Sequence, residues 1–206
     1  MNYKTIAERS EAGFIEKKSE FIGYICPVET EEEAIAFINE IRAMHRKATH
    51  NCYAYILRHN NTARHSDDGE PSGTAGVPMH EVLAKEGLTD VCCVVTRYFG
   101  GILLGAGGLV RAYSKGVKVA IDAAKIKNMC DAAEIELSMD YSLYGRIGAA
   151  LAEYDARIAE ESFTDSVFIR LFLRVEQAEQ FKADLIELCN GRISVQVKQT
   201  VSYDFG

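Results

Sequence analysis

The hydrophobic and polar positions of the first 125 residues switch between strand and helix periods. Residues 21–26 are an apolar run ended by Pro27, residues 51–57 form a second run, and residues 91–96 are apolar and largely β-branched, which is typical of a strand buried on both faces. Arg97 is expected to end that third strand. Apolar residues three or four apart predict helices over residues 31–45 and from Leu109 to about residue 125.

The ends of the predicted helices carry their own signals. Thr30 followed by Glu33 forms a capping-box sequence for the first helix, which we expect to bury Ile35, Phe37, Ile38 and Ile41. The helix from Leu109 should bury one face through Leu109, Tyr113, Val117 and Ala120 and turn its basic residues to the other side. Pro78 fits the start of a third helix that carries Met79, Val82 and Leu83 and ends at Gly87.

Residues 131–206 are predicted to form a second unit, where the composition shifts to acidic. Strands are predicted at residues 135–141, 157–163, 166–175 and 193–203, and helices at residues 143–154 and 176–189. The order is β-α-β-β-α-β, the split unit of ferredoxin-like folds. We therefore predict an α+β protein with domains at residues 1–130 and 131–206.

A glycine-rich loop joins the third strand to the following helix and contains Gly100, Gly101, Gly105, Gly107 and Gly108. A helix start behind such a loop presents unpaired N–H groups and a partial positive charge, which favours an anion. Arg97 and Arg111 would flank this site. The same glycines could instead serve only close packing of the strand against the helix, with the basic residues on a solvated face.

The polar stretch 58–76 has little periodicity and is predicted to be a loop. Asp67, Asp68 and Glu70 could be metal ligands or an acid–base pair, but their spacing favours a turn, and Asp68 or Ser72 could cap the helix that follows. Lys17 and Lys18 could help to bind an anion or could protect a strand edge from pairing.

Composition narrows the possible environments. The chain has 206 residues, of which 48% are hydrophobic and 26% charged, so it can bury a large core. No run approaches the roughly 18 apolar residues of a membrane span, so no membrane contact and a cytoplasmic location are expected. The net charge of −7 lies entirely in residues 131–206, which hold 7 basic and 14 acidic residues, so a nucleic-acid contact should be made by the first domain.

The six cysteines lie in apolar runs without a C-x-x-C pair, and His45 and His50 are not spaced as a helical zinc pair. Buried, reduced thiols are predicted, with Cys92 and Cys93 on opposite faces of their strand. A catalytic role for Cys52 near His50 is conceivable, but we predict that Cys52 belongs to the core. No metal and no cofactor are expected.

Three long blocks, in order, closely resemble the IMPACT family. They are residues 48–55 (ATHNCYAY), residues 66–76 (SDDGEPSGTAG) and residues 94–113 (VVTRYFGGILLGAGGLVRAY). The resemblance implies a bacterial two-domain member. Its N-terminal domain would have the fold of the second domain of ribosomal protein S-five, and its ferredoxin-like C-terminal domain would resemble domain V of elongation factor G.

The resemblance also implies a link to translation, because eukaryotic relatives interfere with activation of the general-control kinase. We expect a non-catalytic, cytoplasmic binding protein whose partner is RNA, the ribosome or a translation-associated protein. One alternative is an enzyme that holds a small phosphorylated or nucleotide substrate on the glycine loop. The other is a protein-docking module.

The candidate site residues follow from the loop and the blocks. The anion or nucleic-acid contacts are expected at His50, Arg97, Tyr98, Gly100, Gly101, Gly105, Gly107, Gly108 and Arg111. The rim or turn is expected at Asp67, Asp68, Glu70, Ser72 and Thr74. No catalytic residue is assigned.

Overall fold

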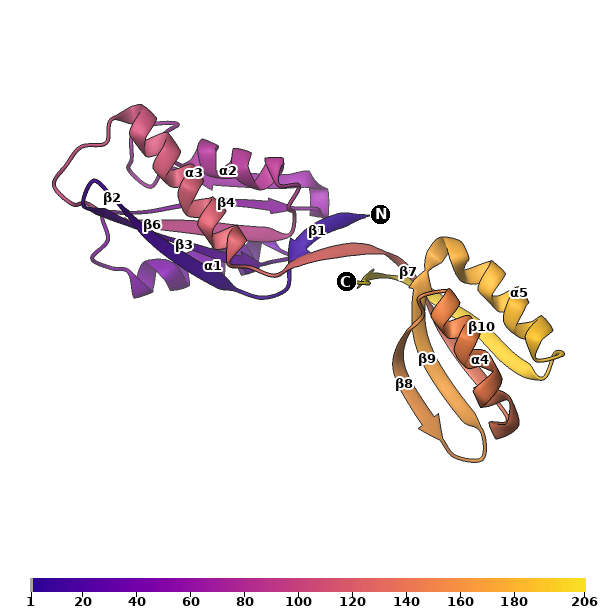
Figure 1. Ribbon diagram of the computed structural model, residues 1–206. Helices are drawn as coiled ribbons and strands as arrows, with labels where there is room; N and C mark the ends of the chain where they lie inside the picture. The colour runs from indigo at the N-terminus through magenta and orange to yellow at the C-terminus, as the bar shows by residue number, and fades with distance from the viewer. Residues whose placement is uncertain (1) are drawn as a thin grey trace. The chain divides into compact units, whose positions relative to one another are not determined.

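The computed structural model describes residues 2–206 and divides into two compact units (Figure 1). The first unit covers Tyr3–Lys127, and the second covers Asn128–Gly206 together with Asn2. In the part of the chain that the structure describes, no helix is long and apolar enough to cross a membrane.

The first unit is built on a five-stranded sheet in the order β2-β3-β6-β4-β5, with every neighbouring pair antiparallel. Its strands are β2 (Ser10–Glu16), β3 (Ser19–Pro27), β4 (His50–Leu57), β5 (Thr62–Ser66) and β6 (Val91–Tyr98). A short strand β1 (Tyr3–Ile6) precedes them, and a 3₁₀ turn η1 (His59–Asn61) lies between β4 and β5. β6 is central and fully buried up to Arg97, as its apolar sequence predicts.

Helices cover both faces of this sheet (Figure 1). On one face, α1 (Glu31–Met44) buries Phe37, Ile38 and Ile41. On the other face, α2 (Gly76–Lys85) and α3 (Ala106–Asp122) pack over the larger core. Cys92 belongs to the first core and Cys93 to the second, which confirms that these thiols point to opposite faces.

α3 approaches β3 closely because two glycines face each other. A Cβ atom on Gly23 would lie 2.0 Å from the carbonyl oxygen of Gly116, so only glycine fits at this position of β3. The close contact places the buried face of α3, including Tyr113, directly on the sheet. The first turn of α3 is thereby held beside the end of β6.

Four local predictions for this unit are wrong. Ile35 is 51% exposed, and Ala34 takes its place in the core because the helical phase puts Ala34, Phe37, Ile38 and Ile41 on one face. Arg97 does not end β6, which continues to Tyr98. Residues 62–66 form the edge strand β5 rather than a loop. α2 begins before Pro78, at Gly76.

The second unit has the predicted ferredoxin-like order. Its elements are β7 (Ile126–Met139), α4 (Tyr141–Glu153), β8 (Arg157–Phe163), β9 (Val167–Arg174), a 3₁₀ turn η2 (Val175–Gln177), α5 (Ala178–Leu188) and β10 (Ile193–Asp204). Within the unit the strands pair antiparallel in the order β10-β7-β9-β8. Alternate residues of β9 are buried and join Leu143, Ile147, Phe181 and Leu185 of the two helices in one core.

Candidate functional site

A cavity of about 400 Å³ lies where the end of β6 meets the first turn of α3. Its wall comes from the start of β4, the turn at residues 69–71, the end of β6 and residues 99–109. Its polar lining residues are Thr49, His50, Glu70 and Arg97, of which Glu70 and Arg97 are buried and Thr49 is exposed. Apolar side chains lie toward solvent: Phe99 is 45% exposed and Leu103 is 82% exposed.

A buried ion pair forms the inner end of the cavity. Arg97 Nη1 donates to Glu70 Oε1 at 2.6 Å, and the two side chains are 6% and 3% exposed. The Tyr113 hydroxyl donates to the same oxygen at 2.8 Å. Arg97 Nη2 donates to Ser19 Oγ at 3.4 Å, whereas Arg97 Nε is buried without a partner among the described residues. The Glu70 carboxylate is thus held by β6 and α3, and Ser19 of β3 helps to hold Arg97.

The hydrogen bond of His50 assigns its tautomer. His50 Nδ1 lies 2.8 Å from the backbone carbonyl oxygen of Asp68, which can only accept, so Nδ1 carries the proton. In the neutral ring Nε2 therefore has a free lone pair. Nε2 lies 3.8 Å from Glu70 Oε2, which accepts no hydrogen bond from any residue in the described range 2–206.

The acidic residues before Glu70 build the turn. The Asp67 carboxylate accepts hydrogen bonds from the backbone N–H groups of Gly73, Ala75 and Gly76 at 2.9, 3.0 and 2.8 Å. Burial raises the pKa of Asp67, but these three bonds stabilise the charged form and hold the pKa below its usual value. Asp67, and not Asp68 or Ser72, therefore satisfies the first N–H groups of α2.

Asp68 and Thr74 complete the turn. Asp68 accepts from the backbone N–H of Asn51 at 2.7 Å and from Arg42 Nη2 at 2.7 Å, which fastens the turn to β4 and α1. Thr74 Oγ1 donates to the carbonyl oxygen of Pro71 at 2.6 Å, and Ser72 is exposed. Of the three carboxylates, Glu70 alone lines the cavity.

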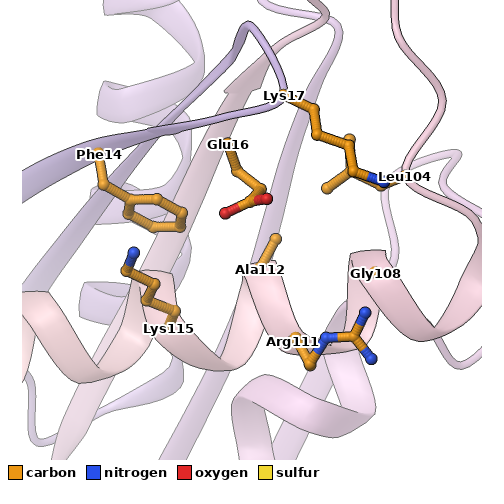
Figure 2. Close-up of a pocket in the computed structure, with 8 residues that line it drawn as sticks. All are labelled: Phe14, Glu16, Lys17, Leu104, Gly108, Arg111, Ala112 and Lys115. Carbon is orange, nitrogen blue, oxygen red and sulfur yellow. The ribbon is translucent and has the colours of Figure 1, made fainter.

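A second pocket of about 260 Å³ lies beside the cavity, between β2 and α3 (Figure 2). Arg111 and Lys115 reach it from α3, and Phe14, Glu16 and Lys17 reach it from the end of β2 and the turn after it (Figure 2). Lys115 Nζ lies 4.3 Å from the centre of the Phe14 ring. Leu104 lines both pockets.

The predicted anion-site residues therefore fall into groups. His50, Arg97 and Gly105 line the cavity, and Gly108 and Arg111 line the second pocket. Gly101 and Gly107 line neither of these two pockets. Gly100 serves packing, because a Cβ atom there would lie 1.9 Å from the carbonyl oxygen of Lys18. The predicted glycine loop thus contains both pocket-lining and packing positions.

Tyr98 lies away from both pockets. Successive side chains of β6 point to opposite faces, and the Tyr98 hydroxyl lies 2.9 Å from Nδ1 of His45 at the end of α1. His45 Nε2 in turn lies 2.6 Å from the Tyr24 hydroxyl. The structure therefore separates Tyr98 from the other anion-site candidates.

Two contributors were missed from the sequence. Tyr113 was predicted only as a core residue, although a tyrosine on an otherwise apolar helix face signals a hydroxyl that needs a buried partner. The apolar rim of the cavity at Phe99 and Leu103 gave no pattern in the sequence, because exposed apolar residues are common.

The Cys52 thiol is buried and donates to the carbonyl oxygen of Asp67 at 2.9 Å. Burial raises its pKa far above the usual value, so the thiolate is suppressed. This supports the core position predicted for Cys52. Among residues 2–206, no group of three or more His, Cys, Asp or Glu side chains is arranged to hold a metal ion.

Comparison with known proteins places both units in one family. Residues 17–121 match the model of the Impact N-terminal domain, and residues 137–192 match that of a domain of unknown function (DUF1949). The chain belongs to the IMPACT family. The resemblance of the three sequence blocks is thereby confirmed.

Two bacterial members of the family match most of the chain. IMPACT family member YvyE of Bacillus subtilis is 40% identical over 196 residues, which cover 95% of this chain and 90% of YvyE. IMPACT family member YigZ of Escherichia coli is 35% identical over 182 residues, which cover 87% of this chain and 89% of YigZ. The protein IMPACT homolog of Dictyostelium discoideum is 38% identical over 95 residues, only 27% of its own length.

A solved structure shares the two-domain fold. It is titled "Crystal structure of an hypothetical protein", has a TM-score of 0.61 and 32% sequence identity, and covers 96% of this chain and 98% of its own. The predicted α+β fold class is thus confirmed.

Proposed function

We propose that this IMPACT family member is a non-catalytic binding protein linked to translation, and that its first unit contacts a phosphate-bearing partner, RNA or the ribosome. The link to translation rests on the family. The place of contact rests on one observation, the three exposed cations Lys17, Arg111 and Lys115 around the second pocket (Figure 2).

These cations are suited to a phosphate backbone. Within the described range 2–206, none of the three has a carboxylate within ion-pair distance, so each can meet a phosphate without first breaking an ion pair. Phe14 stacks on Phe21 and has Lys115 over its ring, so it positions Lys115 rather than offering a free face to a base. Glu16 is the one acidic residue that lines the pocket. The positive surface is small, in agreement with a localised contact on an acidic protein.

Arg97 has a different role in this proposal from the one expected from the sequence. Its side chain is 6% exposed and already paired with Glu70, so a bulky RNA backbone cannot reach it without breaking a buried ion pair. We therefore assign the phosphate contact to Arg111, Lys17 and Lys115. Arg97 and His50 belong to the neighbouring cavity.

The test is a titration of the purified protein with tRNA, with ribosomal subunits and with mononucleotides at several salt concentrations. The variant replaces Lys17, Arg111 and Lys115 by Gln. Its control replaces Lys85, Arg146 and Arg192 by Gln, which removes the same charge from exposed residues outside the pocket.

The pocket variant should bind more weakly. The slope of log K against log salt is negative, and it should become shallower by about 0.7–0.9 for each lost phosphate contact. If both variants lose the same affinity, the loss comes from the lower net charge alone, and the proposed place of contact is wrong. Binding to mononucleotides alone would favour the enzyme alternative. A protein partner that still co-purifies after nuclease treatment would favour the docking alternative. Either result would overturn the proposal.

A further inference from the structure

The cavity at the end of β6 is not used by the proposed phosphate contact, and its polar groups are of two kinds. At its inner end, Glu70 Oε2 is an acceptor, and so is Nε2 of the neutral His50 ring. At α3, the first backbone N–H groups of the helix are donors. Leu103, Leu104 and Leu109 provide apolar wall. A ligand for this cavity needs a donor, an acceptor and an apolar part.

Glu70 Oε2 and His50 Nε2 are placed to bind one hydrogen-bond donor between them. With the proton of the neutral His50 ring on Nδ1, the Nε2 lone pair and the Glu70 carboxylate lie 3.8 Å apart with no proton between them. One nitrogen can lie about 2.8–3.0 Å from both atoms at this separation. An ammonium group has three N–H donors and a positive charge, so it can bond both acceptors and compensate the carboxylate.

The helix end calls for an anion. Gly105 is the N-cap of α3 at a φ of 72°, and no side chain caps this helix. The N–H group of Ala106, which lines the cavity, has no acceptor among the described residues. Beside them, Arg97 lines the cavity with its Nε unpartnered, although its side chain is only 6% exposed. A carboxylate could accept from the helix end and gain from the field of Arg97.

We propose that the cavity binds a free α-amino acid with an apolar side chain. Its ammonium lies between Glu70 and His50, its carboxylate at the first turn of α3, and its side chain against Leu103 and Leu104. Because Arg97 and Glu70 balance each other, a zwitterion enters without leaving a net charge unpaired. A phosphate would instead meet the free oxygen of Glu70. The proposal goes beyond the proposed function and does not depend on it.

The cavity is of suitable size. Ligand sites typically have volumes of about 300–1,000 Å³. At about 400 Å³, this cavity falls at the small end of that range, where a single amino acid fits better than a nucleotide. The open rim at Phe99 and Leu103 gives the ligand a path from solvent.

The test is calorimetric titration of the nucleic-acid-free protein with L-leucine, L-methionine and L-phenylalanine. Two analogues of leucine each lack one of its charged groups: 4-methylpentanoate lacks the ammonium, and leucinamide lacks the carboxylate. We expect saturable binding of at least one of the three amino acids, and at least tenfold weaker binding of both analogues when leucine is the reference. No binding of any of the three at millimolar concentration overturns the proposal.

The analogues, a dipeptide and two variants also test the proposal. An analogue that binds as tightly as leucine shows that the end it lacks has no role, and the dipeptide Leu-Gly binding more tightly than leucine would assign the cavity to peptide termini. Either result overturns the proposal. The variant Leu103→Ser should weaken amino-acid binding several-fold, whereas Ile15→Ser, which changes an equally exposed apolar residue outside the cavity, should not. Equal effects of both substitutions count against the site.

Discussion

Glu70 and Arg97 form an ion pair that is almost completely removed from solvent, with Oε1 and Nη1 2.6 Å apart. The two residues come from a turn and from the central strand, 27 positions apart in the chain. The same carboxylate oxygen accepts from Tyr113 of α3. One acidic side chain therefore joins the turn, the sheet and the helix around the cavity.

Removal of this carboxylate should strongly destabilise the first unit. Glu70→Ala leaves a buried guanidinium and a buried hydroxyl without their acceptor, and we expect a loss of about 3–5 kcal/mol in the free energy of unfolding. Urea denaturation followed by circular dichroism measures it. Glu40→Ala breaks the exposed pair with Arg9 and should cost less than about 1 kcal/mol. Similar losses in the two variants would contradict the structural role of Glu70.

The sequence predicted the second unit better than the first. In residues 131–206 strand β9 alternates clearly, the two helices are well separated from the strands, and short turns join the elements. The order β-α-β-β-α-β could therefore be read from the sequence, although β8 is almost wholly exposed. In the first unit, β5 has the sequence Thr-Ala-Arg-His-Ser and buries little, because it is an edge strand. A strand without a buried face leaves no alternation in the sequence.

The site was predicted only in part for a similar reason. The glycine loop and Arg97 marked the right region, because strand, loop and helix follow each other along the chain. The pairing of Arg97 with Glu70 could not be predicted, since it depends on how the turn at residues 67–74 folds back over the end of the sheet. The conformation of this turn depends on three hydrogen bonds from backbone N–H groups to Asp67, which no periodicity in the sequence reveals.

Two glycine substitutions should have opposite effects on stability. Gly23→Ala places a methyl group 2.0 Å from the Gly116 carbonyl oxygen and must push α3 away from β3, so a loss of about 1–3 kcal/mol or more is expected. Gly145→Ala lies within α4, where a Cβ atom meets nothing within 4 Å, and should gain about 0.5–1 kcal/mol. Thermal or urea denaturation of each variant measures both. A neutral Gly23→Ala would show that α3 and β3 are not held this closely.

The thiols should differ in reactivity. Cys26 is half-buried, whereas the other five cysteines are buried. Burial raises the pKa of Cys26 as well, so its reaction with a disulfide reagent should be slow at pH 7 and should speed up as the pH rises. We expect one thiol to react in the native protein, and Cys26→Ser to abolish that phase. A fast reaction that persists in Cys26→Ser would place another thiol at the surface.

The turn that carries Glu70 should weaken in acid through Asp67. Because three backbone N–H groups hold the pKa of Asp67 below its usual value, the charged form stabilises the fold fully above the unfolded pKa of about 3.9, and this contribution is lost as the pH falls through the folded pKa. Asp67→Asn should therefore cost about 0.5–2 kcal/mol at pH 7. The difference from the unchanged protein should shrink below about pH 4.

Urea denaturation of both proteins at pH 7 and pH 3 measures this effect. Asp165→Asn is the matched control, because Asp165 is exposed and makes no hydrogen bond or ion pair with any residue in the described range 2–206, so its substitution should change stability little at either pH. A cost of Asp67→Asn that is the same at both pH values would show that the carboxylate charge does not hold the turn. The turn would then depend on the shape of the side chain alone.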